Sequence, residues 1–513
     1  MRYVRDANGD VIEIWSKASS SATNIQLVQD VDNAPFGGVK YIHYGNNTAM
    51  VKYFTSDYDV SGIVVEKYGP WARLLARTYH YVDNQNITAI TDDLNSANDQ
   101  DYWYDNNNRL QNGDGSWGEY QYYYDGTGNR QHRILTDGGT TIAQRFWYDE
   151  NVSNRILSMD LDGTETRTFS HDAAGNMLTD VKNSVSTAYG YNNAGRMTSV
   201  SIGGVQKGGY IYNANGQLAS RSVLNSTPST ISHSLYDLNG NLIAEADASG
   251  TIVREYIWLE HATGGEQTGA ATPIAIHADM DTASPILNYV HADHLDRPIM
   301  MTDDNQAITW QATYLPFGEV QSVTGTAAND NRFPGQYYQL ESGLNYNWHR
   351  QYDPSLARYI QADPLGLVDG TSRYAYVNSD PLQMVDPKGL NRARNSGPFG
   401  PLGGDGFSSG FGGNRLGFGG GGGAGKFNSP KQYTPNSTSL KKPNICKVPP
   451  NYGQPISPIR TNPPLNPVNL NKTKSEVGYT RPPAKQTTPG RRESSTKLFN
   501  NIMKAIGDFL EGF

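Results

Sequence analysis

Residues 171–178 read HDAAGNML, and residues 191–197 read YNNAGRM. Both stretches place an aromatic residue before Asp or Asn, and then two or three turn-forming residues, a polar residue and an apolar residue. The Asp or Asn side chain in such a phrase can accept hydrogen bonds from nearby backbone N–H groups, and Gly or Asn tolerates a positive φ angle. The phrase therefore predicts a tight turn between two β-strands.

The phrase recurs at intervals of 20 to 24 residues. Clear copies begin at Tyr104, Tyr124, His171, Tyr191, Tyr212 and Tyr236, and weaker copies begin at Tyr81 and Tyr148. One hairpin of about 20 residues cannot bury its apolar face alone, so stacked copies predict a long, curling antiparallel sheet. The alternative is an ordinary β-sandwich with Gly-rich turns, which eight registered copies disfavour.

The composition agrees with an all-β chain. Of 513 residues, 54 are Gly and 33 are Tyr, and the hydrophobic fraction is 37%. Many turns with many tyrosines favour strands with aromatic cross-strand pairs. The chain has no run of 18 apolar residues, which argues against a transmembrane helix. Residues 1–15 do not resemble a signal peptide. The single cysteine, Cys446, excludes an intramolecular disulfide.

The repeated phrase resembles the YD repeat of bacterial RHS proteins, of the B and C components of insecticidal toxin complexes, and of animal teneurins. Residues 289–298 (YVHADHLDRP) and 314–319 (YLPFGE) resemble the stretch near the end of the RHS shell. Residues 332–390 resemble the RHS repeat-associated core domain, and 358–367 (RYIQADPLGL) is its most recognisable string.

This resemblance implies a spiral β-shell, or cocoon, whose interior holds the C-terminal polypeptide. We expect an N-terminal β segment at 1–50, YD repeats at 51–288 and the core at 289–390. Family shells commonly have more repeats, so we expect a partial shell. The chain is then a truncated copy, an orphan fragment, or one half of a shell that another chain completes.

Two Asp-Pro-x-Gly strings lie in the core, at 363–366 and 386–389. Each alone predicts a tight turn, because proline keeps the preceding residue out of the α region and glycine permits the turn. In the C components of toxin complexes, however, self-cleavage follows the Leu that closes the core and requires an arginine and two aspartates.

The resemblance places these catalytic residues on Arg350, Asp363 and Asp386, and the scissile bond between Leu390 and Asn391. Two neighbouring carboxyl groups cannot both ionise easily, so their pKa values separate. One group can then act as general base and the other as general acid. Which aspartate takes which role stays open. Arg350 would hold a carboxylate ionised or stabilise the oxyanion.

The composition and charge of the chain change at the same bond. Residues 391–513 hold 17 Lys and Arg against 5 Asp and Glu. The whole chain has 42 Lys and Arg and 50 Asp and Glu, so residues 1–390 hold 25 Lys and Arg against 45 Asp and Glu. Residues 391–494 are rich in Gly, Pro, Asn and Lys, so we expect a low-complexity basic tail that does not fold alone. The tail has no histidine, and catalysis there is not expected.

Residues 495–513 have a different pattern from the rest of the tail. Apolar residues recur at i, i+3, i+4 and i+7 steps, which predicts an amphipathic helix. They are Leu498, Phe499, Ile502, Met503, Ile506, Phe509, Leu510 and Phe513. The helix would dock on the inner wall of the shell or on a chaperone; the alternative is binding to an anionic membrane.

His291, Asp293 and His294 have a spacing that could suggest a metal site, but their turn-rich β context favours a structural use. We therefore expect no metal and no cofactor.

The function expected from the resemblance is a toxin-delivery shell that encapsulates its C-terminal segment and releases it by cutting itself once after Leu390. The alternatives are a surface or secreted YD-repeat binding protein that does not cleave, and an orphan RHS fragment. The expected partners are another shell chain or an upstream RHS region, a secretion-system component and an immunity or chaperone protein. No specific nucleic acid is expected. We expect export by a non-classical route from the cytoplasm.

Overall fold

A computed structural model describes residues 1–17, 24–35, 38–82, 84–149, 153–226, 229–259 and 271–394. Strands β1 to β28 form a single antiparallel sheet of 28 strands, in which each strand pairs with the next one along the chain. The first fourteen strands are β1 (Arg2–Arg5), β2 (Val11–Ser16), β3 (Ile25–Asn33), β4 (Val39–Tyr44), β5 (Thr48–Phe54), β6 (Val60–Lys67), β7 (Ala72–Tyr81), β8 (Ile87–Asp92), β9 (Gln100–Tyr104), β10 (Leu110–Gly115), β11 (Gly118–Tyr124), β12 (Arg130–Asp137), β13 (Thr140–Tyr148) and β14 (Ile156–Leu161). The remaining fourteen are β15 (Thr164–His171), β16 (Met177–Lys182), β17 (Val185–Tyr191), β18 (Met197–Ile202), β19 (Val205–Tyr212), β20 (Leu218–Val223), β21 (Thr230–Tyr236), β22 (Leu242–Ala246), β23 (Ile252–Leu259), β24 (Thr272–Ala278), β25 (Ile286–Ala292), β26 (Pro298–Thr302), β27 (Ile308–Tyr314) and β28 (Val320–Gly325).

The chain then leaves this sheet and forms smaller elements. A four-stranded sheet contains β29 (Tyr337–Gln339), β30 (Leu344–Asn347), β31 (Arg350–Asp353) and β32 (Arg358–Tyr359), and a two-stranded sheet contains β33 (Met384–Val385) and β34 (Ala393–Arg394). Two short 3₁₀ helices are η1 (Ser96–Asn98) and η2 (Val377–Ser379). Neither of these helices in the described ranges has the length or apolar character needed to span a membrane.

The repeated phrase forms the hairpin turns, as predicted. His171, at the end of β15, pairs with Met177, at the start of β16, across the turn. Asp172 lies in the turn between them, and its two carboxylate oxygens accept hydrogen bonds from the backbone N–H and the side-chain amide of Asn176, each at 2.8 Å. Gly175 adopts φ +96°, which glycine accepts without the steric cost of a side chain.

The tyrosine that opens a phrase also links adjacent repeats. In six cases its hydroxyl donates to the backbone carbonyl of the residue that follows the previous turn. The donors and acceptors are Tyr81 and Val60 (2.8 Å), Tyr124 and Leu110 (2.7 Å), Tyr148 and Arg130 (2.9 Å), Tyr191 and Met177 (2.7 Å), Tyr212 and Met197 (2.6 Å), and Tyr236 and Leu218 (2.9 Å). In these six repeats the aromatic residue thus links the repeat to its neighbour in addition to packing.

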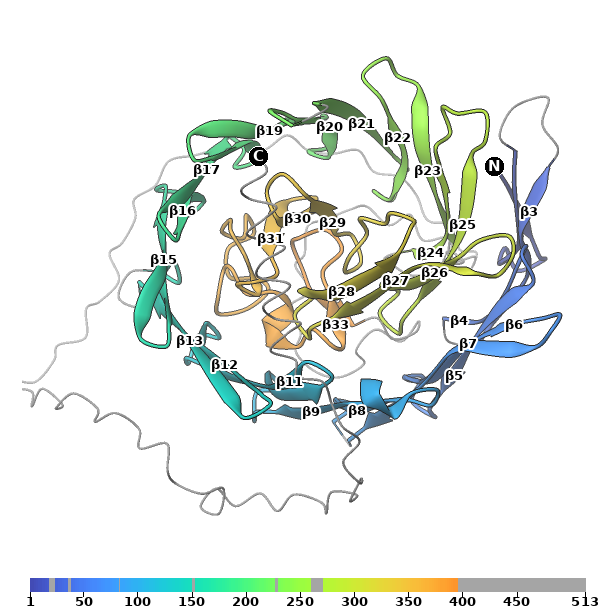
Figure 1. The fold of residues 1–513 in the computed structure, drawn as a ribbon, viewed down its shortest axis with the longest axis horizontal. Helices are drawn as coiled ribbons and strands as arrows, with labels where there is room; N and C mark the ends of the chain where they lie inside the picture. The colour runs from blue at the N-terminus through green and yellow to red at the C-terminus, as the bar shows by residue number, and fades with distance from the viewer. Residues whose placement is uncertain are drawn as a thin grey trace, which may run out of the picture. The chain divides into compact units, whose positions relative to one another are not determined.

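Within residues 1–394 the sheet curves until its late strands face its early ones, and Figure 1 shows β3 to β22 following one another along the curve. Tyr44 on β4 donates to the carbonyl of Val290 on β25 at 3.0 Å. Lys52 on β5 pairs with Asp296 at 2.8 Å. Strands β24 to β28 therefore lie on the concave side of β4 to β12.

The concave side of the middle strands is covered by residues that follow the long sheet, and Figure 1 shows β29 to β31 on this inner side. Leu344, Tyr346, Leu356 and Ile360 join one apolar cluster with buried residues of β13 to β20. Arg167 on β15 pairs with Asp353 at 2.8 Å, and Arg221 on β20 pairs with Glu341.

The all-β prediction and the long antiparallel sheet are confirmed. Of the predicted basic tail at 391–494, residues 395–494 lie outside the described residues, as does the predicted helix at 495–513. Within the described part of the tail, Ala393–Arg394 forms β34.

Candidate functional site

The three predicted catalytic residues come from different elements of the core. Arg350 begins β31, Asp363 follows β32, and Asp386 follows β33. The predicted scissile bond between Leu390 and Asn391 lies in the loop that joins β33 to β34, where Val385 pairs with Ala393. This hairpin therefore holds both sides of the bond.

Arg350 is the centre of the site, because its guanidinium contacts both aspartates. Its Nη1 lies 3.0 Å from Oδ2 of Asp363, and its Nη2 lies 3.2 Å from Oδ2 of Asp386. Its Nε–H donates to the carbonyl of Gly389 at 2.7 Å. The guanidinium carbon also lies 3.6 Å from the centre of the Tyr359 ring, and Arg350 is only 2% exposed. The structure thus brings all three residues together in a buried cluster.

Asp386 contacts the predicted scissile bond directly. Its Oδ1 accepts hydrogen bonds from the backbone N–H of Leu390 at 2.9 Å and of Asn391 at 3.2 Å. Its Oδ2 accepts one from the hydroxyl of Tyr359 at 2.7 Å, besides the contact with Arg350. All four neighbours donate, so both carboxylate oxygens act as acceptors.

Asp363 has a different environment. Its Oδ1 accepts a hydrogen bond from the backbone N–H of Leu365 at 2.7 Å. Burial raises the pKa of Asp363, the neighbouring Arg350 opposes this rise, and the charge of Asp386 adds to it. The two carboxylates therefore differ in their partners while they share one guanidinium.

Both Asp-Pro-x-Gly strings also form the turns that the structural reading predicts. The N–H of Gly366 donates to the carbonyl of Asp363 at 3.0 Å, and the N–H of Gly389 donates to that of Asp386 at 3.3 Å. Gly389 adopts φ +66°, and a Cβ atom there would lie 2.4 Å from the carbonyl oxygen of Asn347. Turn formation and site assembly are thus compatible.

The sequence analysis missed three residues near the bond. Tyr359 belongs to the recognised string at 358–367, which was the available signal. Asn347 donates to the Tyr359 hydroxyl at 2.8 Å and to the carbonyl of Asp386 at 2.8 Å. Asp369 accepts a hydrogen bond from the backbone N–H of Arg392 at 3.2 Å. No local pattern marks Asn347 or Asp369, because Asn347 contacts Asp386 across 39 positions and Asp369 contacts Arg392 across 23.

The histidines considered above have structural contacts. His291 contacts the Thr302 hydroxyl at 3.0 Å, and burial lowers its pKa to about 3. His294 contacts the carbonyl of Leu382 at 2.7 Å. Among the described residues, no group of three or more His, Cys, Asp or Glu is arranged to hold a metal ion.

Several known proteins are similar to parts of this chain. Toxin protein Tse5 of Pseudomonas aeruginosa is 39% identical over 87 residues, which are 17% of this chain and 7% of Tse5. Double-stranded DNA deaminase toxin A of Burkholderia cenocepacia is 26% identical over 305 residues, which are 49% of this chain and 21% of that protein. The TcdB2-TccC3 crystal structure matches with a TM-score of 0.62 and 18% identity, over 76% of this chain and 21% of that one. These similarities agree with the expected resemblance to RHS/YD-repeat toxins.

No protein-family model matches this chain. It spans well under two thirds of each of these relatives. The TcdB2-TccC3 likeness establishes that the long antiparallel sheet of this chain has the fold of that shell.

Proposed function

We propose that the chain is part of an RHS toxin shell that cuts itself once after Leu390. One observation carries the proposal. Asp386 accepts a hydrogen bond from the N–H of Asn391, which is the leaving nitrogen, and shares Arg350 with a second buried aspartate.

The contacts support a division of roles. Asp386, which faces only donors, acts as the general base, and Asp363, whose pKa is raised, acts as the general acid. Asp386 takes a proton from water, whose oxygen adds to the carbonyl carbon of Leu390, while Asp363 protonates the carbonyl oxygen.

The adduct then collapses. The C–N bond breaks and the Asn391 nitrogen takes the proton from Asp386. One of the two hydroxyl groups of the adduct returns its proton to Asp363, which leaves the carboxyl group of Leu390. The distance of 3.2 Å between Asp386 Oδ1 and the Asn391 nitrogen suits this transfer.

Arg350 and Tyr359 position the machinery. Arg350 fixes the carbonyl of Gly389, one residue before the bond, and orients both carboxylates. The Tyr359 hydroxyl, held by Asn347, keeps Asp386 Oδ2 occupied so that Oδ1 faces the scissile peptide.

The names of two relatives contain the word toxin, and the similar crystal structure holds TccC3 together with TcdB2. By analogy, we propose that the segment after Leu390 is the delivered cargo and that a second shell chain completes the enclosure. A secretion component and an immunity or chaperone protein remain proposed partners.

The variants Asp386→Asn and Asp363→Asn test these roles. The fraction of each chain that is cut after Leu390 is measured over time. Each change should slow processing by at least about 100-fold, because it removes a proton-transfer group. Asp237→Asn is the matched control, since Asp237 forms the same kind of turn in a repeat and contacts no residue of the site. Processing of both site variants at the wild-type rate would refute the mechanism.

A binding protein that does not cleave is the second candidate. The closed ion-pair network around Arg350 and the two complete turns would also stabilise a shell that does no chemistry. In that case the purified wild-type chain stays intact.

A further inference from the structure

The segment just after the predicted scissile bond is docked through its arginines. Strand β34 pairs with β33, which places Met384 opposite Arg394. Arg392 and Arg394 alternate with Ala393 and lie on the tail side of the bond. Each arginine meets an acidic group contributed by another part of the chain.

Arg392 is bound by Asp369. The backbone N–H of Arg392 donates to Asp369 Oδ1 at 3.2 Å, and the guanidinium Nη1 lies 3.5 Å from the same oxygen. The guanidinium also donates to the backbone carbonyl of Asp369. The Asp369 side chain is 19% exposed and the Arg392 side chain is 34% exposed, so this pair lies near the surface.

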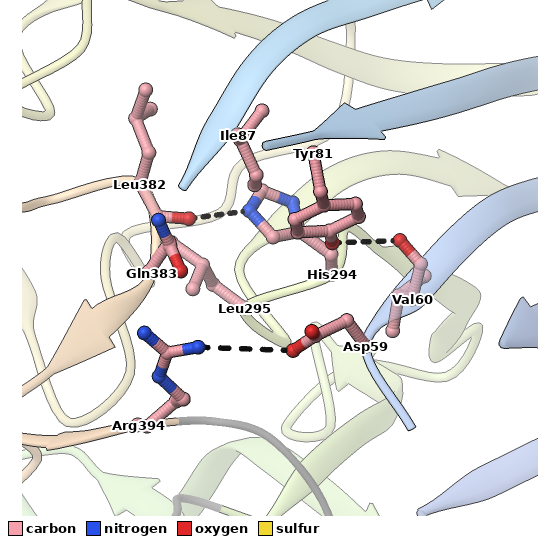
Figure 2. Close-up of a pocket in the computed structure, with 9 residues that line it drawn as sticks. All are labelled: Asp59, Val60, Tyr81, Ile87, His294, Leu295, Leu382, Gln383 and Arg394. Carbon is pink, nitrogen blue, oxygen red and sulfur yellow. Dashed lines mark hydrogen bonds and ion pairs between the residues drawn. The ribbon is translucent and has the colours of Figure 1, made fainter. Parts of the chain in front are cut away.

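Arg394 enters a pocket between the core and the repeats, and Figure 2 shows its guanidinium directed at Asp59. Its Nη1 lies 3.9 Å from Oδ1 of Asp59 and donates to the side-chain oxygen of Gln85 at 2.7 Å. Asp59 and Gln85 belong to the early repeats, more than 300 positions from Arg394 along the chain. The arginine thus links the cut site to the wall of the sheet.

A third carboxyl group, that of Asp380, is buried and incompletely hydrogen-bonded. Asp380 is 5% exposed, and its Oδ1 has no hydrogen-bond partner among the described residues. Burial raises the pKa of Asp380 to about 7, and the charges of Arg394 and then Arg392 oppose this rise. A buried, unpaired carboxylate oxygen is costly unless a positive charge lies near it.

We propose that Asp59 and Asp369 form an acidic clasp that binds Arg392 and Arg394, so that the tail stays docked after the bond is cut. This inference rests on the proposed self-cleavage. Hydrolysis would add one more cation to the docked segment, because the new amino group of Asn391 forms 3.2 Å from the position of Asp386 Oδ1 and is protonated at neutral pH. Cutting and release are then separate steps.

The first test uses the processed full-length protein. The N-terminal fragment is immobilised, and the dissociation rate of the tail fragment is measured for the wild type, Arg394→Gln and Asp59→Asn. Loss of a shielded, charge-assisted contact should speed dissociation about tenfold or more in both variants. Arg394→Lys should restore part of the retention. Arg460→Gln, which removes a tail charge outside the clasp, is the matched control and should behave as wild type.

The second test needs no self-cleavage and so separates the clasp from the proposed function. In uncut Asp363→Asn protein, trypsin must capture the Arg394 side chain to cut after it, and docking should protect that site. Adding Asp59→Asn should speed this cut about tenfold or more. An unchanged tryptic rate, or an unchanged dissociation rate in the processed protein, would overturn the clasp. A wild-type chain that is never cut would overturn only the self-cleavage.

Discussion

At the scale of single residues, the tyrosines of the YD phrase have two uses. The sequence analysis predicted aromatic cross-strand packing, and the structure adds a hydrogen bond from each of six tyrosine hydroxyls to a carbonyl in the preceding repeat. Tyr191, for example, donates to Met177 at 2.7 Å. The spacing of 14 residues between them did not predict this bond, because it depends on how one hairpin leans on the next.

Tyr191→Phe tests this contact. The variant keeps the ring but leaves the Met177 carbonyl without its donor, so the free energy of unfolding should fall by about 1 kcal/mol. Tyr123→Phe is the control, because the Tyr123 side chain is 44% exposed and donates only to Gln121 on the surface. Denaturant unfolding of both variants measures the difference. Equal stability of the two would show that the linking bond contributes nothing.

Asp380 gives a pH-dependent prediction at the same scale. Burial raises its pKa to about 7 from an ordinary 3.8, so between these values the folded chain holds a proton that the unfolded chain has lost. Its contribution to the free energy of unfolding is complete below about pH 4 and is lost as pH rises through about 7. Asp380→Asn removes this titration.

The variant should therefore gain stability relative to wild type as pH rises from 5 to 8, by at most about 1.4 kcal/mol per pH unit. Unfolding curves at several pH values measure this difference. The control is Asp57→Asn, because Asp57 is exposed. The difference in stability between this variant and wild type should show no such trend with pH. A constant difference between Asp380→Asn and wild type would contradict the pKa assigned to this carboxyl.

At the scale of elements, the turns were predictable and the docking of the core was not. Asp172, Gly175 and Asn176 define a hairpin from local chemistry alone. By contrast, Arg167 meets Asp353 across 186 positions, and Arg394 meets Asp59 across more than 300. No periodicity encodes such contacts. Arg350, Asp363 and Asp386 were identified only through the family resemblance, and the clasp residues carried no signal at all.

Arg167→Met tests how the core is held. Arg167 binds both oxygens of Asp180, at 2.7 and 2.5 Å, and Asp353 at 2.8 Å. Methionine fills similar space but leaves two buried carboxylates unpaired, so the free energy of unfolding should fall by about 3–5 kcal/mol. Chemical denaturation measures it. The control is Arg145→Met, where the arginine lies over Trp147 on an exposed face. A loss below about 1 kcal/mol for Arg167→Met would mean that the pair does not anchor the core.

At the scale of the whole molecule, the number of repeats led us to expect a partial shell. The described residues show how so few hairpins form a packed body. Strands β24 to β28 turn back onto β4 to β12, and the core covers the concave side of the middle strands, so the sheet needs fewer repeats to bury its apolar face. The acidic body, with 45 Asp and Glu against 25 Lys and Arg, suits the retention of a basic segment that holds 17 Lys and Arg against 5 Asp and Glu.

The most direct test of the account is the intact mass of the purified wild-type chain under denaturing conditions. Self-cleavage predicts two species, one that ends at Leu390 and one that begins at Asn391, and both should be replaced by a single full-length species in Asp386→Asn. A wild-type chain of full-length mass only, or a cut at any other bond, would contradict the central claim.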